Sequence, residues 1–301
     1  MSDTPYFNVT VSNWSEAKEA FAQLRGFYFR GQVNADWPLT TSLERAAKRA
    51  GLGPKALLQA ESIIVRTFRR RAHHFVPSPP AADEEIEWLA LIQHHGGPTR
   101  LLDFTHSAYV AAFFAMETAD QPAAVWAING FALRRRISET FLTDFLKDHL
   151  NLNLEHVSIA QEILRGKREA VGTLWLEPDR LNERMAVQQG IFLFTCDLRR
   201  SFEENLLTIF GIPVDILNST APMSIKDIPT FLSNADIVKI QLPRQLHPEG
   251  LLDLEQMNVS AASLFPGLDG FTRSLSGILR RYDAVTQLRR STLGPDAVVF
   301  T

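Results

Sequence analysis

The stretch QHHGGPTRLLD, residues 93–103, is the most informative part of this sequence. It lies between two apolar segments, residues 84–92 and 107–116, whose composition predicts helices. Two glycines and a proline in the stretch would end the first helix abruptly. A backbone of this kind, held between rigid elements, can direct several side chains toward one point. We therefore expect this stretch to be the centre of a functional site.

The polar side chains of this stretch have candidate roles. His94 and His95 project about 100° apart on a helix, so both cannot readily face one ligand, and no bound metal is expected. An imidazole titrates near neutrality and suits a general acid/base or a hydrogen-bond donor, and His95 is the candidate here. The alternative is structural, with Arg100 and Asp103 paired and the histidines ending the helix. The candidate site residues from this stretch are Gln93, His95, Thr99, Arg100 and Asp103.

A second group is FRGQ, residues 29–32, at the end of a short aromatic strand. Arg30 would lie at the rim of a sheet, where its planar donors suit a phosphate or a carboxylate. Gly31 would allow a ligand to approach closely or the backbone to turn. Gln32 completes the group. The alternative is an arginine tied to a buried carboxylate.

A third group is Gln188, Gln189 and Gly190, directly before the apolar run 191–195. Amides at the entrance of a strand can hydrogen-bond a sugar or a base without adding charge. A polar helix end is the alternative.

The composition limits the class of protein. The chain has 301 residues, 45% hydrophobic and 22% charged, and a formal net charge of -3, which is typical of a globular protein without a global basic field. Its single cysteine, Cys196, excludes an internal disulfide and predicts a small buried side chain. The chain has no signal-peptide pattern and no apolar run of membrane-spanning length, so we expect a cytoplasmic protein without a membrane partner.

Short strands mixed with many helices predict an α+β fold, with one or more small mixed sheets flanked by helices. No linker divides the chain, and residues 131–170 are expected to form a helical insertion or a lid. The expected strands are 7–11, 27–30, 37–40, 123–128, 173–176, 190–195 and 237–242, and the expected helices include 14–24, 42–50, 54–75, 107–116, 179–187 and 270–282.

Five arginine runs, such as residues 69–71 and 134–136, stand out in this acidic chain. Most such runs are solvated helix faces, but several on one surface could bind a nucleic-acid backbone. No phosphate-binding glycine loop, dinucleotide fingerprint, zinc-protease motif or serine-nucleophile motif is present, which argues against the common enzymes that use them.

The groups described above resemble, in order, the signatures of the FRG-domain family, which is named for its tripeptide. Residues 29–45 resemble the opening signature, 93–105 the central one, with Phe104 where tryptophan is usual, 184–192 a later one and 264–270 the closing one. The resemblance runs from about residue 27 to 279, so it implies a single FRG-type domain over residues 1–301.

The family is mostly bacterial and phage-associated, and several members resemble parts of toxin or defence systems. It is distantly similar to the ADP-ribosyltransferase fold, which implies a split sheet core and NAD as the cofactor. By this fold-level analogy Arg30 would anchor the pyrophosphate and Gln188 or Gln189 would orient the ribose or the acceptor. Asp103 would fix Arg100 within the site. Gly190 stands where that superfamily has a glutamate.

Three functions follow from the resemblance as expectations. The first is an NAD-dependent ADP-ribosyltransferase-like toxin or phage-defence effector that modifies a protein, DNA or RNA, with an antitoxin or a defence-system partner. The second is a nuclease that uses His95, Arg100 and Asp103. The third is a non-catalytic sensor of a nucleotide or a phage protein.

Overall fold

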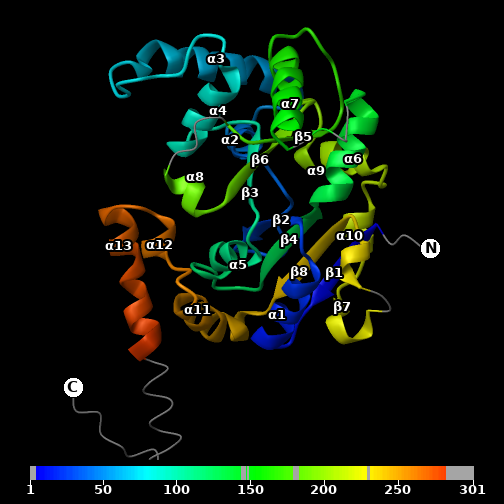
Figure 1. The fold of residues 1–301 in the computed structure, drawn as a ribbon, viewed down its shortest axis with the longest axis vertical. Coiled ribbons are helices and arrows are strands. Elements are labelled where there is room, and N and C mark those ends of the chain that lie inside the picture. The colour runs from blue at the N-terminus through cyan, green and yellow to red at the C-terminus, as the bar shows by residue number, and fades with distance from the viewer. Residues whose placement is uncertain (1–4, 144–146, 148, 179–182, 229–230, 283–301) are drawn as a thin grey trace, which may run out of the picture.

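The computed structural model describes residues 5–143, 147, 149–178, 183–228 and 231–282. The fold is α+β, as the sequence predicts, and consists of one mixed eight-stranded sheet with helices packed against it (Figure 1). The strands are β1 (Tyr6–Thr10), β2 (Phe27–Gln32), β3 (Leu101–Thr105), β4 (Ala123–Asn129), β5 (Thr173–Leu176), β6 (Gly190–Thr195), β7 (Met223–Ser224) and β8 (Ile237–Leu242).

The helices lie between these strands along the chain. They are α1 (Trp14–Gln23), α2 (Ser42–Arg49), α3 (Pro54–Ala72), α4 (Glu85–His94), α5 (Ala108–Met116), α6 (Gly130–Phe141), α7 (His149–Leu164), α8 (Glu183–Val187), α9 (Phe202–Phe210), α10 (Ile216–Ser219), α11 (His247–Gln256), α12 (Ala261–Leu264) and α13 (Leu268–Ser274), with short 3₁₀ helices η1 (Ile225–Asp227), η2 (Leu232–Asn234) and η3 (Arg244–Leu246). Among the described residues, every helix is too short or too polar to span a bilayer.

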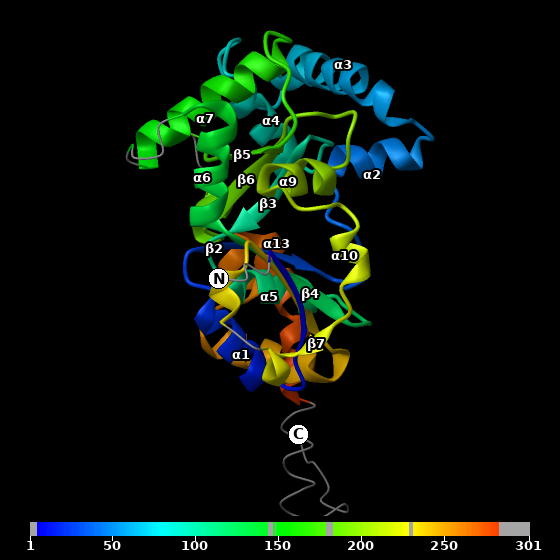
Figure 2. The same ribbon diagram turned by 90° about the vertical axis from the view of Figure 1, so that its right-hand side faces the viewer.

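The sheet has the strand order β5-β6-β3-β2-β4-β8-β1-β7 and narrows at its third junction. β3 pairs with β6 over five residue pairs and β2 with β4 over six, but β2 and β3 share only the pair Phe29–Thr105. The two strands therefore diverge on leaving this pair. The three strands on one side and the five on the other lie in two parts of the molecule, one above the other in Figure 2.

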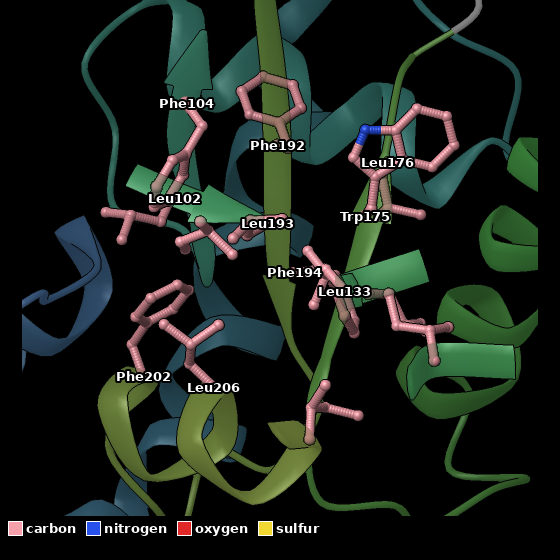
Figure 3. Packing of buried hydrophobic residues seen from close by; sticks show 14 of the residues in the cluster. Leu102, Phe104, Leu133, Trp175, Leu176, Phe192, Leu193, Phe194, Phe202 and Leu206 are labelled. Atoms are coloured by element: carbon pink, nitrogen blue, oxygen red, sulfur yellow. The ribbon is translucent and has the colours of Figure 1, made fainter. Parts of the chain in front are cut away.

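Each part of the sheet carries apolar side chains on the face that its helices cover. Along β4, Val125 and Ala127 pack toward α1, α5 and α11, whereas Trp126 and Ile128 face the opposite core. This alternation is expected because successive side chains of a strand point to opposite faces. This opposite core is the second core of the protein. In it, side chains of β3, β5 and β6 pack against α6 and α9, as Figure 3 shows.

Described residues of the range 131–170 contribute to this second core. Leu133 and Ile137 of α6 and Ala160 of α7 are fully buried there. The predicted helical character is confirmed by α6 and α7. Cys196 is also buried among these apolar side chains, without a disulfide partner, as the sequence predicts.

One predicted strand was wrong and two strands, β3 and the two-residue β7, were missed. Residues 37–40 form no strand. Residues 101–105 form β3 near the middle of the sheet. The polar Asp103 interrupts the apolar run there, and this hides the strand in the sequence.

Gly31 has a packing role in β2. A Cβ atom on this residue would lie 2.0 Å from the carbonyl oxygen of Ala111 and 2.6 Å from the amide nitrogen of Ala115, both in α5. Helix α5 is rich in alanine and lies directly on β2 (Figure 1). The missing side chain at Gly31 therefore allows the helix to approach the strand, which accounts for the glycine without any ligand.

Replacing Gly31 by alanine should destabilise the protein, because the added methyl group meets backbone atoms that cannot move alone. We expect the free energy of unfolding to fall by about 1–3 kcal/mol or more, measured by urea denaturation. Gly53→Ala is the matched control, because a Cβ there has no neighbour within 4 Å. Equal stability of the two variants would contradict this role for Gly31.

His156 of α7 is completely buried, and its Nδ1 lies 2.9 Å from the carbonyl oxygen of Trp175. A carbonyl oxygen only accepts, so Nδ1 carries the proton and Nε2 is unprotonated. Nε2 is buried without a hydrogen-bond partner. Burial disfavours the charged ring and lowers the pKa of His156 to about 4.

This shift predicts a loss of stability in acid. The folded-state pKa is below the unfolded value of about 6.5, so the stabilisation is complete above pH 6.5 and is lost as the pH falls to about 4. The contribution is up to about 3 kcal/mol. Urea denaturation between pH 7 and pH 4 should show a shallower pH dependence for His156→Gln than for the wild type. His73→Gln, at an exposed position, should keep the wild-type slope. Parallel curves for all three proteins would refute the assignment.

Candidate functional site

A pocket of about 280 Å³ opens where β2 and β3 diverge. The end of α4, one side of α5, helix α8 and the start of β6 complete its walls. The lining residues are Phe29, Arg30, Gly31, Ala90, Gln93, His94, Asp103, Phe104, Thr105, Phe114, Arg184, Met185, Gln188, Gly190, Ile191 and Phe192. The pocket thus joins parts of all three groups identified in the sequence, and no described residue of 131–170 is among its lining residues.

Arg30 lies on β2 at the narrow end of the pocket. Its Nη1 donates a hydrogen bond of 2.7 Å to the backbone oxygen of Asp103 and lies 4.0 Å from the carboxylate Oδ2 of the same residue. Its Nε is buried and has no hydrogen-bond partner. Burial lowers the pKa of Arg30 to about 10, with the charge of Arg45 adding to this and that of Asp103 opposing it. The guanidinium is therefore charged at neutral pH, largely desolvated and incompletely paired.

Asp103 is the carboxylate that lines the pocket. It projects from the middle of β3, between the buried Leu102 and Phe104, and its side chain is 58% exposed. Its Oδ2 accepts a hydrogen bond of 2.8 Å from Nε2 of Gln93. The carboxylate is thus fixed in direction and open to the cavity.

Gln93 is held in place from behind. Its amide oxygen accepts hydrogen bonds from the hydroxyl of Thr99, at 2.6 Å, and from that of Ser42, at 3.2 Å. Thr99 is completely buried and does not line the pocket. The structure therefore places Thr99, a predicted ligand-binding residue, behind the pocket wall, where it orients Gln93.

Arg100 does not enter the pocket either. It is 1% exposed and its guanidinium is bonded to the carboxylate of Glu61 on α3, with Nε–O distances of 2.8 and 2.9 Å. It also donates to the backbone oxygen of Thr195, at 3.2 Å, and lies over the ring of Phe194. The expected contact between Asp103 and Arg100 is absent, because β3 directs these side chains to different surroundings. Arg100 joins α3 to the sheet.

The two histidines point in different directions, as expected for neighbours at a helix end. His94 lines the pocket, and burial, with the charges of His95 and Arg184, lowers its pKa below the usual value. His95 is exposed and lines a separate hollow beside α3. The sequence favours His95 as the site residue, whereas the structure brings His94 to the pocket.

The third sequence group is also divided. Gln188 lines the pocket, and its Nε2 donates a hydrogen bond of 2.9 Å to the backbone oxygen of Leu264. Gln189 has a φ of 50° and is exposed outside the pocket. Its backbone oxygen accepts from the amide of His106 at 3.0 Å. Gln189 thus shapes the turn, and Gln188 presents an amide to the cavity.

Gln32 lies beyond the pocket on β2. It is 8% exposed, its Oε1 accepts a hydrogen bond of 2.7 Å from Nε1 of Trp126, and its Nε2 donates to the backbone oxygen of Pro38. Both ends of the amide are occupied within the fold. The structure therefore gives Gln32 a place in the core beside the site.

Arg184 is a pocket residue that our candidate set lacks. Its guanidinium lies 4.6 Å from the ring centre of Phe265, and Arg273 lies 4.3 Å from that ring. Burial and the charge of Arg273 lower the pKa of Arg184, whereas Asp103 opposes this. The sequence signal was its position four residues before Gln188, which puts both on one helix face.

The arginine runs do not converge on one surface. Those in the described residues lie on α3, on α6, after β6 and near α13, in separate places in Figure 1. The run at 289–290 lies outside the described residues. Several arginines are also paired with acids, and these pairs are Arg135–Glu139, Arg136–Glu139, Arg199–Asp197, Arg200–Asp197 and Arg281–Glu255. The described arginine runs thus lie on separate elements, and several of their charges are paired, which argues against a shared footprint for a nucleic-acid backbone.

No group of three or more His, Cys, Asp or Glu side chains in the described part of the chain is arranged to hold a metal ion.

The buried pair of Arg100 and Glu61 gives a test of its structural role. Arg100→Met should lower the free energy of unfolding by about 3–5 kcal/mol, because it leaves the Glu61 carboxylate buried without a partner. The double variant Arg100→Met, Glu61→Leu should recover much of this loss, since neither charge then remains. Urea denaturation of the wild type, both single variants and the double variant would measure the coupling. A double variant as unstable as the sum of the single ones would contradict it.

Residues 25–124 match the FRG domain, a protein family. This range contains β2, the α4–β3 segment and α5, and therefore Arg30, Gln93 and Asp103 of the pocket. The chain thus contains a segment that matches the FRG domain, over about a third of its length. The match ends before α8 and before the segment around Phe265, which supply the opposite wall. No curated protein and no solved structure matches the chain.

Proposed function

We propose that the pocket binds the nicotinamide half of NAD and that the protein transfers ADP-ribose to an acceptor. The observation that carries this proposal is the incompletely paired guanidinium of Arg30 beside the Asp103 carboxylate. The Arg30 guanidinium hydrogen-bonds the backbone oxygen of Asp103 through Nη1, and the side chain lines the pocket. A pyrophosphate oxygen in the pocket would accept a charge-assisted hydrogen bond from this guanidinium.

The charges of the lining support an anionic ligand. Arg30 and Arg184 are two cations, and Asp103 is the single carboxylate among the lining residues. A guanidinium binds phosphate oxygens with directed, charge-assisted hydrogen bonds. The second arginine lies on the α8 wall, so the cations approach a ligand from two elements. The two cations and one carboxylate leave one excess positive charge, which favours the phosphate joined to the nicotinamide ribose.

The size and the apolar lining of the pocket indicate which part of NAD it would hold. The volume of about 280 Å³ is at the lower end of the roughly 300–1,000 Å³ of small-molecule pockets. It is too small to enclose a whole dinucleotide but suits a flat ring and its ribose. Phe29, Phe114 and Phe192 supply aromatic surface for such a ring. The remaining nucleotide would extend along the rim.

Asp103 supplies the negative charge that this chemistry requires. Gly190 has no carboxylate to stabilise a ribosyl cation, but the Asp103 carboxylate faces the same cavity from β3. In the transfer, the bond from the ribose C1′ to the nicotinamide nitrogen breaks and its electron pair leaves with nicotinamide. The acceptor loses a proton and bonds to C1′. A fixed carboxylate beside the developing positive charge would lower the barrier.

The biological role that fits this activity is a toxin or a defence effector that modifies a protein or a nucleic acid. This part of the proposal rests on the resemblance of the FRG-domain family to such systems. A nuclease is less favoured, because His95 and Arg100 lie outside the pocket and the arginine runs are dispersed.

Two variants should separate binding from turnover. Arg30→Ala should weaken the binding of ADP-ribose at least about tenfold, by loss of charge-assisted hydrogen bonds worth about 1.5–3 kcal/mol. Asp103→Asn keeps the shape and should retain binding but reduce nicotinamide release by about 10²–10³. Calorimetry measures the first effect, and nicotinamide release with mass spectrometry of a lysate incubated with NAD measures the second.

His95→Ala is the control, since this side chain lies outside the pocket, and it should change neither quantity. Absence of NAD and ADP-ribose binding by the wild type would refute the proposal. Binding that stabilises the protein thermally without any nicotinamide release would instead identify a sensor.

A further inference from the structure

Helix α3 buries little of its own surface. Of its 19 residues only Leu57, Glu61 and Ala72 are buried. Ile63 is 46% exposed on the helix, and Phe75, just beyond its end, is 82% exposed. Large apolar side chains grouped in this way on a surface commonly mark an interaction site.

These side chains form a groove between the second half of α3 and the end of α4. The groove has a volume of about 750 Å³. Its floor is mostly apolar, and Arg71 and His95 are its ionisable residues. The lining residues are Ile63, Ile64, Thr67, Phe68, Arg71, Ala72, Phe75, Val76 and His95.

The charged side chain that lines the groove is an arginine. None of the lining residues is acidic, Arg71 lies among them, and Arg70 is exposed next to them in the chain. The single acid of α3, Glu61, is buried against Arg100 and does not offset this charge. A second copy that docked through the same face would bring like charges together, which disfavours a symmetric dimer here.

We propose that the groove binds an acidic amphipathic helix of a partner protein. Apolar side chains spaced three and four residues apart would fill the floor, as in other helix-in-groove complexes. Carboxylates on the flanks of that helix would face Arg71 and the neighbouring cations. A nucleic acid would satisfy the charges but would leave Phe75 and Ile63 without apolar contact.

This surface is separate from the pocket of Arg30 and Asp103. The two hollows have no lining residue in common. The proposal for this groove therefore does not depend on the proposed activity, and refuting either one would not affect the other.

The test uses the full chain and a fluorescent helical peptide about five turns long. Leucines on one face and glutamates on the flanks make the probe, and a second peptide has lysines in place of the glutamates. Fluorescence anisotropy should show salt-dependent binding of the acidic peptide and at least tenfold weaker binding of the basic one. Phe75→Ser and Arg71→Glu should each weaken binding of the acidic peptide at least tenfold.

Phe231→Ser is the matched control, because Phe231 is a comparably exposed phenylalanine, at 70%, away from the groove. It should leave binding unchanged. The proposal would be overturned if the acidic peptide did not bind, or if the Phe75→Ser and Arg71→Glu variants bound it as tightly as the wild type. Two other results would also overturn it. One is binding of single-stranded RNA that the Arg71→Glu variant abolishes. The other is a dimer, detected by sedimentation, that the Phe75→Ser variant abolishes.

Discussion

The pair of Phe29 and Thr105 is the single ladder pair between β2 and β3, and the site depends on it. Strands that diverge from such a pair no longer pack their side chains against each other, so a cavity opens between them. The helices cannot close this cavity, because α5 is fixed on β2 by its contact with Gly31 and α4 is fixed to β3 through Gln93. The polar groups between the diverging strands thus face the cavity, while the two neighbouring hydrophobic cores remain buried.

The chemistry of the pocket is determined by residues behind it as much as by those that line it. Thr99 and Ser42 hold the amide of Gln93 so that its Nε2 must point to Asp103. Such pre-orientation means that little entropy is lost when a ligand binds. On the other wall, Arg184 and Arg273 both lie against the ring of Phe265, and Arg184 lines the cavity.

Sequence reasoning succeeded where a residue's role is local and did not where the partner is distant in the chain. The strand 237–242 follows from a short pattern. The expected end of a strand at Arg30 was wrong, because β2 continues to Gln32 and Arg30 pairs with Trp126 inside the sheet. The partner of Arg100 is Glu61, 39 residues earlier, and no local pattern predicts that contact. The directions in which His94 and His95 point depend on where α4 ends against the sheet. The strand β3 was not predicted because the polar Asp103, which faces a cavity, interrupts its apolar pattern.

The ion pair of Arg100 and Glu61 has a mechanical consequence. It bonds α3, which forms one wall of the groove, to the residue that directly precedes β3, which carries Asp103. A force that shifts α3 must either carry the start of β3 with it or separate two buried charges, at a cost of about 3–5 kcal/mol. The ion pair therefore ties α3 to the start of β3, so a displacement of α3 that leaves β3 in place has to break it.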